Sequence, residues 1–198
     1  MSDIETRIRE AGRRIGPADA DAVVAAAEDE GLVDVAYASV DSPFGTFIAA
    51  VTDRGLVRVA LTSEREDVIA GLASALSPRV LESPRRLDDV RRQLDEYFAG
   101  RRSIFDLTVD WSLVRGFNRR VLRATARIPY GAVTSYGSVA KTAGSARAAR
   151  AAGNALHNNP VAIVVPCHRV VGANGKLVGY GGGLEMKEAL LRLEGALE

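Results

Sequence analysis

The pattern of apolar residues changes along this chain, and the change restricts the folds that it can form. Apolar and polar residues alternate in three short runs between residues 33 and 62, and turn signals separate the runs. From residue 117 the apolar residues recur every three or four positions, as on one face of a helix. The chain therefore combines a strand-rich part with a helical part, and we expect an α/β (α+β) fold.

The strand-rich part has the pattern of a small antiparallel-sheet module. Residues 33–40, 46–52 and 56–62 are predicted strands, and turn signals at 42–45 and 53–55 join them. Such short connections favour a meander. A helical pattern follows over residues 85–99 and is ended by Gly100, and residues 103–112 are expected to add one more strand.

The second half is predicted to be a helical domain with a helix-turn-helix. After a helix over 117–128, Thr134 or Ser135 would cap a helix that runs through Ala143. Ser145 would then cap a helix over about 146–156, whose sequence ARAARAAGNAL has mostly tiny side chains. Such a helix can approach a nucleic-acid groove closely, or it can pack tightly on a neighbouring helix, and the sequence favours neither.

Three segments follow from these patterns. Residues 1–32 are predicted to be a helical appendage of unassigned role, with one helix over 4–15 and a second that starts at Pro17. Residues 33–110 would form the N-terminal α/β domain, and residues 111–198 the C-terminal domain.

The residue content excludes several kinds of protein. A single cysteine excludes an internal disulfide, and two histidines make a closed zinc site implausible, so we expect no metal. No stretch of 18 uncharged apolar residues occurs, and the N-terminus lacks the apolar core of a signal peptide. We therefore expect a cytoplasmic protein without a membrane partner.

The net charge of +1 hides a strong asymmetry. Residues 1–110 carry 14 Lys and Arg against 21 Asp and Glu, whereas residues 111–198 carry 12 against 4. The four acids of the second half all lie after residue 184, and ten basic residues precede them. A long stretch with basic residues and no acid is typical of a surface that meets a polyanion, although a solvated basic face is the simpler alternative.

The single cysteine has unusual neighbours. Most lone cysteines are small hydrophobic core residues, but Cys167 follows an apolar, strand-like run over 161–165 and precedes His168 and Arg169. Both neighbours favour the thiolate over the thiol. A final helix is predicted over 185–197, with the sequence EMKEALLRLEGAL. A histidine base needs an orienting acceptor, and Glu194 is the best candidate because it falls on the apolar side of this helix.

These residues resemble a known family. The sequence PCHRV at 166–170 resembles the active-site signature of the O6-alkylguanine-DNA alkyltransferases, also called methylated-DNA–protein-cysteine methyltransferases. The likeness extends through IPYG, SYG, AARAAGNA, NNPVAIVVPCHRVVG, GYGGG and LLRLEG in the family's order. SPFGTFIAA and RGLVRVA resemble the family's N-terminal domain more weakly, and residues 1–32 fall outside the resemblance.

The resemblance implies a reaction and the residues that perform it. The protein would repair DNA by moving an alkyl group irreversibly from O6 of guanine, or O4 of thymine, to its own thiolate, once per molecule. Cys167 would accept the alkyl group, and His168, a water molecule and Glu194 would deprotonate it. Asn159 would hold the active-site loop. No cofactor is implied, and zinc-binding residues of some relatives have no counterpart here.

The resemblance also implies a surface for double-stranded DNA that contains O6-alkylguanine. Tyr136 would press on the rotating phosphate and donate to the guanine, and Arg150 would fill the gap left by the flipped nucleotide. Val170 would bind the base, and Tyr180 and Gly181 would cover the alkyl group, although some relatives have serine in place of Gly181. The DNA backbone would be contacted by Asn118, Arg119, Gly137, Ser145 and Ala173.

Three other functions fit parts of the sequence. An alkyltransferase-like sensor of lesions would lack the acceptor cysteine, which is present here as Cys167. A helix-turn-helix regulator would need polar side chains that read base edges, and ARAARAAGNAL has few. A thiol hydrolase would need an oxyanion hole and turnover. The protein is expected to be a monomer.

Overall fold

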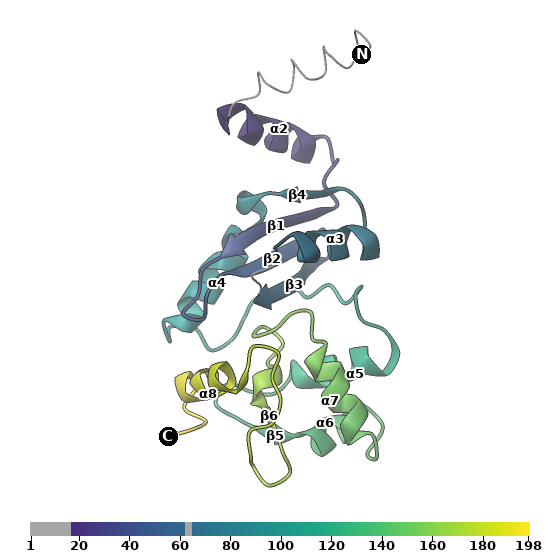
Figure 1. The fold of residues 1–198 in the computed structure, drawn as a ribbon, viewed down its shortest axis with the longest axis vertical. Helices are drawn as coiled ribbons and strands as arrows, with labels where there is room; N and C mark the ends of the chain where they lie inside the picture. Colours follow the sequence, from purple (N-terminus) through teal and green to yellow (C-terminus); the bar gives the residue numbers. More distant parts are fainter. Residues whose placement is uncertain (1–16, 62–64) are drawn as a thin grey trace.

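The sheet forms where the alternating pattern predicts it. In the computed structural model, which describes residues 17–61 and 65–198, strands β1 (Val35–Val40), β2 (Phe47–Thr52) and β3 (Gly55–Leu61) form an antiparallel meander. A fourth strand, β4 (Val80–Glu82), was not expected from the sequence. It pairs parallel with β1, so the strand order is β3-β2-β1-β4 (Figure 1).

A helix covers each face of this sheet, which explains why the strands are buried on both sides. On one face Val35, Ile48 and Val57 pack with Val68 and Leu72 of helix α3 (Arg65–Ala75), a helix that the sequence patterns did not predict. The other face packs on helix α4 (Asp88–Phe98), which follows a 3-10 turn at Pro84–Leu87. The helix predicted over 85–99 is therefore present, and Gly100 follows its end with a φ of +69°.

The strand predicted over 103–112 does not form. Only a one-residue bridge joins Val109 to Leu56, closed by Leu56 N donating to Thr108 O and Asp110 N donating to Leu56 O. The pairing ends there because Asp110 turns the chain: its buried carboxylate accepts hydrogen bonds from Thr52 Oγ1 and from Ser112 N.

The second half is helical, as the periodicity predicts. It contains α5 (Gly116–Thr125), α6 (Tyr136–Thr142), α7 (Ala149–His157) and α8 (Leu184–Leu193). The two short strands β5 (Thr134–Ser135) and β6 (Val170–Val171) pair in parallel, and a 3-10 turn, η2 (Cys167–Arg169), lies immediately before β6. Helices α6 and α7 are the two helices of the predicted helix-turn-helix.

Ser135 caps its helix as predicted, but Ser145 does not. The Ser135 hydroxyl accepts a hydrogen bond from Ser138 N at the start of α6. After Gly144, Ala148 N donates to Ser145 O and closes a turn, so the first helical acceptor of α7 is Ala148. The predicted start at residue 146 was wrong because this turn occupies residues 145–148.

The sheet and the C-terminal helices share one hydrophobic cluster, which joins the two parts of the chain. The cluster contains Val59 of β3, Tyr97 of α4, Val121 of α5 and Leu190 of α8. The main chain also connects the parts, because Val59 N donates to Pro160 O over 2.8 Å. The predicted domain boundary near residue 110 therefore crosses a continuous core, and the division into domains stays a prediction.

The first described helix lies at the far end of the molecule from the C-terminal helices. Helix α2 (Pro17–Asp29) stands beyond β4 in Figure 1. The helix predicted over 4–15 lies outside the described residues. Within the ranges 17–61 and 65–198, no helix has both the length and the apolar character needed to cross a membrane.

Candidate active site

Cys167 is buried at the start of η2, with Asn159 beside it. Cys167 is 7% exposed to solvent. The Asn159 side chain donates from Nδ2 to Cys167 Sγ over 3.2 Å and to Val165 O over 2.8 Å. Its Oδ1 accepts from Val161 N over 3.1 Å. Asn159 thus fixes both ends of the segment that leads to the cysteine.

That segment is not the strand that the sequence predicted. Val165 N donates to Val161 O and Val164 N donates to Ala162 O, so residues 161–165 form a tight turn. Ile163 has a φ of +72°, a conformation that β-branched residues rarely adopt. The buried Ile163 side chain and the hydrogen bonds of Asn159 hold this backbone in place. The run is apolar because it lies in the core, and not because it extends as a strand.

His168 and Glu194 form the pair that the helical position of Glu194 predicted. His168 Nε2 lies 2.9 Å from Glu194 Oε1, and both side chains are inaccessible to solvent. Because an ionised carboxylate only accepts, the proton of the neutral imidazole lies on Nε2. The other nitrogen, Nδ1, is buried, has no hydrogen-bond partner in the described part of the chain, and is left as a proton acceptor.

Glu194 is the centre of a larger buried network. Besides His168, its carboxylate accepts from Tyr97 Oη over 2.7 Å and from Arg169 Nε and Nη2 over 2.8 Å each. Gly131 N also donates to it, over 3.3 Å. Burial raises the pKa of Glu194, but the hydrogen bonds from His168 and Arg169 outweigh it and lower the pKa to about 2. The carboxylate is therefore ionised at neutral pH.

Arg169 does not stabilise the Cys167 thiolate as its place in the sequence suggested. Its guanidinium is paired with Glu194 and also donates to Ile128 O. Burial lowers the pKa of His168, so the imidazole is uncharged at neutral pH, whereas Arg169 is charged but paired. Arg169 therefore acts on Glu194, whereas the backbone of His168 still helps to lower the pKa of the Cys167 thiol.

The cation that acts on Cys167 is Lys187, which the sequence analysis missed. This fully buried lysine of α8 donates from Nζ to Val170 O over 2.6 Å and to Val178 O over 2.9 Å. Burial raises the pKa of the Cys167 thiol, and the hydrogen bond from Asn159 and the charge of Lys187 oppose that rise. The helical spacing Lys187, Leu190, Leu191, Glu194 places the lysine on the buried face and could have identified it.

A cavity of about 300 Å³ opens beside Cys167. It is lined by Tyr180 and Gly181, the residues expected to cover an alkyl group. The Tyr180 hydroxyl is buried, and no residue that the structure describes forms a hydrogen bond with it. The sheet also contributes to the lining, through Phe47 of β2 and Arg58 of β3. No feature of the sequence patterns pointed to a contribution from the sheet.

Tyr136 and Val170 are held by the protein outside the lining of this cavity. The Tyr136 hydroxyl donates to Val178 O over 3.1 Å, and its ring lies 5.9 Å from Lys187 Nζ. Burial raises the pKa of Tyr136, and so does the negative charge of Cys167 when it is ionised. Val170 is fully buried in β6, and neither residue lines the 300 Å³ cavity.

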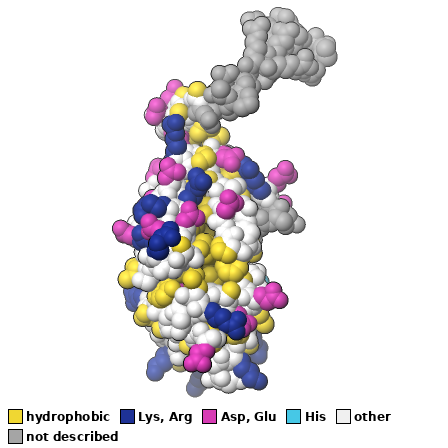
Figure 2. Space-filling view, turned by 90° about the vertical axis from the view of Figure 1, so that its left-hand side faces the viewer, with side chains coloured by type: hydrophobic (Ala, Val, Ile, Leu, Met, Phe, Trp, Pro, Cys, Tyr) yellow, Lys and Arg dark blue, Asp and Glu magenta, His cyan; other side chains and the backbone are white. Residues whose placement is uncertain are grey.

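The residues expected to contact DNA differ in accessibility. Asn118, Arg150 and Ala173 are exposed, and Gly137 and Ser145 are partly exposed. Arg119 is held by the protein itself, since it donates to Val114 O over 2.8 Å and to Trp111 O over 3.2 Å. In Figure 2, several basic side chains lie around the end of the molecule that is opposite α2.

Comparison with known proteins gives matches to both halves of the chain. The sequence model "6-O-methylguanine DNA methyltransferase, ribonuclease-like domain" matches residues 35–111. The model "6-O-methylguanine DNA methyltransferase, DNA binding domain" matches residues 116–196. A methylated-DNA–protein-cysteine methyltransferase of Mycolicibacterium paratuberculosis is 45% identical over 163 residues, which is 81% of this chain and 92% of that protein. Its namesake in Methanosarcina acetivorans is 39% identical and covers 81% and 98%.

Solved structures agree with these matches. The O6-methylguanine methyltransferase of Mycobacterium tuberculosis superposes with a TM-score of 0.70 at 40% identity, covering 82% of this chain and 93% of that one. A second structure, Mycobacterium tuberculosis OGT in complex with DNA, gives a TM-score of 0.69 at 39% identity and covers 81% and 93%.

Proposed function

The chain belongs to the O6-methylguanine DNA methyltransferase family, and on that basis we propose that it repairs double-stranded DNA by moving an alkyl group from O6 of guanine to Cys167. One observation carries the proposal: the single cysteine lies at a cavity, held by Asn159, next to a buried His168–Glu194 pair. The acceptor, the base and the group that orients the base are therefore all present.

The first step is deprotonation of the thiol. His168 is neutral and its Nδ1 is the acceptor, so a water molecule between Nδ1 and Sγ would carry the proton from Cys167 to His168. Glu194, which stays ionised, stabilises the imidazolium that results. Burial raises the pKa of the Cys167 thiol, and this relay lets the thiol lose its proton to His168 and become the nucleophile.

The second step is transfer of the alkyl group. The target base leaves the duplex, because its O6 is out of reach inside the stack. The thiolate sulfur bonds to the alkyl carbon while the bond from that carbon to O6 breaks and guanine takes up a proton, for which Tyr136 is the candidate donor. The thioether is stable, and the chain has no second cysteine to resolve it. Each protein molecule, acting as a monomer, is therefore consumed by one lesion.

Incubation with a duplex oligonucleotide that contains O6-methylguanine tests the proposal. The peptide that contains Cys167 is expected to gain the mass of one methyl group, with one methyl transferred per protein molecule. The Cys167→Ala variant, incubated in the same way, is the control and should gain none. A wild-type protein that leaves the lesion intact would overturn the assignment, and repeated turnover would instead favour a hydrolytic thiol enzyme.

The surface of α7 is the proposed DNA contact, and Arg150 is the proposed gap-filling residue. The Arg150→Ala variant is expected to repair a lesion in duplex DNA about tenfold more slowly, because only the duplex needs a residue that replaces the flipped nucleotide. Its reaction with free O6-benzylguanine should change less than twofold. The measurement is the rate of each reaction, and Arg147→Ala, an exposed arginine in the turn before α7, is the matched control. Equal losses on both substrates would remove Arg150 from this role.

A further inference from the structure

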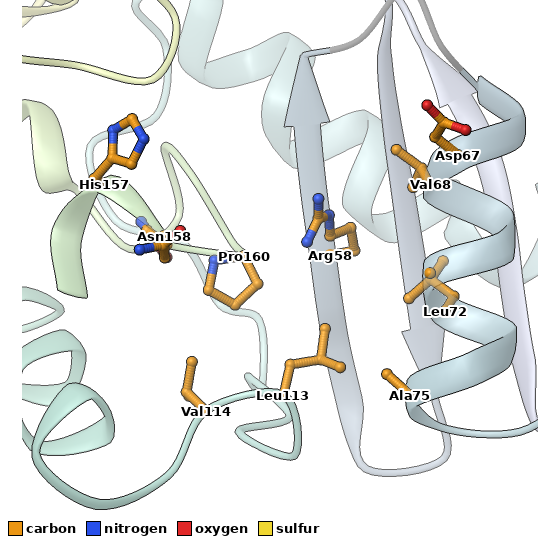
Figure 3. Close-up of a pocket in the computed structure, with 12 residues that line it drawn as sticks. Arg58, Asp67, Val68, Leu72, Ala75, Leu113, Val114, His157, Asn158 and Pro160 are labelled. Atoms are coloured by element: carbon orange, nitrogen blue, oxygen red, sulfur yellow. The ribbon is translucent and has the colours of Figure 1, made fainter. Parts of the chain in front are cut away.

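Arg58 of β3 stands where two cavities adjoin. It lines the cavity of about 300 Å³ that contains Cys167, and it also lines a second cavity of about 420 Å³. His157 and Asn159 also line both cavities. Figure 3 shows Arg58 between α3, which carries Asp67 and Leu72, and the loop after α7, which carries Pro160. The sheet thus contributes a guanidinium to the space beside the acceptor sulfur.

This guanidinium is poorly paired within the described part of the protein. Its Nε is buried and has no hydrogen-bond partner among residues 17–61 and 65–198. Burial lowers the pKa of Arg58, and no described carboxylate offsets that effect. Asp67 lines the second cavity only, and no acidic residue is among those described that line the cavity of Cys167. A half-buried cation without a counter-ion costs free energy, which an anionic ligand in the cavity would recover.

We propose that Arg58 binds the end of O6-alkyl groups that carry a carboxylate, so that this protein favours such lesions over uncharged ones of the same size. The inference rests on the proposed function. Cys167, Tyr180, Gly181 and Arg58 all line this one cavity. An alkyl group that enters this cavity at Cys167 therefore shares it with the Arg58 side chain. A planar guanidinium and a carboxylate form two parallel hydrogen bonds, which also fix the orientation of the group.

The reaction itself is the same for such a lesion. The Cys167 sulfur bonds to the carbon attached to O6, the bond from that carbon to O6 breaks, and its electron pair stays on O6. Guanine takes up one proton, and the carboxylate remains ionised throughout. Arg58 therefore takes no part in bond making, and its effect is to bind the alkyl group and align its reacting carbon with the sulfur.

The test compares three duplexes, which carry O6-methylguanine, O6-(para-carboxybenzyl)guanine or the uncharged O6-(para-carbamoylbenzyl)guanine. The two benzyl groups match in size, so the ratio of their transfer rates reports the charge alone. Wild-type protein is expected to favour the carboxylate about tenfold, as a charge-assisted hydrogen bond would give. Arg58→Met should bring the ratio to about one, Arg58→Lys should keep a preference, and Arg58→Glu should reverse it.

The outcomes separate this inference from the proposed function. Arg101→Met changes an exposed arginine after α4 and should keep the wild-type ratio. Absence of methyl transfer by the wild-type protein would contradict the proposed function. If the wild-type protein transfers methyl but transfers the two benzyl groups at equal rates, Arg58 does not have the proposed role. The same conclusion would follow if Arg58→Met kept the wild-type ratio of these two rates.

Discussion

In the Glu194→Gln variant, the free energy of unfolding at pH 7 is expected to fall by roughly 3–5 kcal/mol, the usual cost of leaving a buried charge without its partner. Glu194 accepts from Tyr97, His168, Arg169 and Gly131, and its side chain is inaccessible to solvent. Glutamine keeps the shape, but its amide group places hydrogens opposite the donors of Arg169. The measurement is urea unfolding of the wild-type protein and the variant.

The matched control lies on the same helix. Glu188 forms an ion pair with Arg192 over 2.7 Å, and its side chain is 41% exposed. Glu188→Gln is therefore expected to change the free energy of unfolding by less than about 0.5 kcal/mol, as for other exposed pairs. Similar losses for the two variants would show that burial of the Glu194 network contributes little.

The stability difference should also depend on pH. The pKa of Glu194 is lowered from its ordinary value to about 2 in the folded protein, so the unfolded chain binds the proton first as the pH falls. The stabilisation is complete above the ordinary carboxyl pKa and is lost as the pH falls toward 2, by about 3 kcal/mol in total. The gap between wild type and Glu194→Gln should therefore narrow between pH 5 and pH 3. A difference in the free energy of unfolding that does not change with pH would contradict ionisation of Glu194 as its cause.

The Lys187→Met variant is expected to react with free O6-benzylguanine roughly thirtyfold more slowly at pH 7, which corresponds to about 2 kcal/mol. Lys187 is a positive charge that favours the Cys167 thiolate, and its ammonium group holds Val170 O and Val178 O. Methionine fills similar space without the charge. Lys176→Met, which changes an exposed lysine, is the control and should react at the wild-type rate.

A pH profile separates the electrostatic effect from a structural one. Burial lowers the pKa of Lys187 to about 8, so the wild-type protein loses this positive charge as the pH rises through that value. The advantage of wild type over Lys187→Met should therefore be largest below pH 8 and shrink above it. A rate ratio that is equal at pH 7 and pH 9 would assign Lys187 to packing alone.

Local patterns in the sequence predicted much of the fold. The three meander strands and helices α4 to α8 follow from alternation, helical spacing and turn residues, all of which depend on near neighbours in the chain. The strand predicted at 103–112 and the strand-like run at 161–165 failed for one reason. An apolar segment is compatible with any buried backbone, and the hydrogen bonds of Asp110 and Asn159 select turns in these places.

The chemistry of the acceptor follows from the sequence: the PCHRV signature contains the one cysteine with a histidine next to it, and helical spacing brings Glu194 to that histidine. The tertiary structure alone decided the charges around the sulfur. Glu194 neutralises Arg169, Lys187 supplies the nearby cation, and Arg58 enters from the sheet. The physical reason is that electrostatic effects depend on distance and burial in space, and the packing of distant segments sets both.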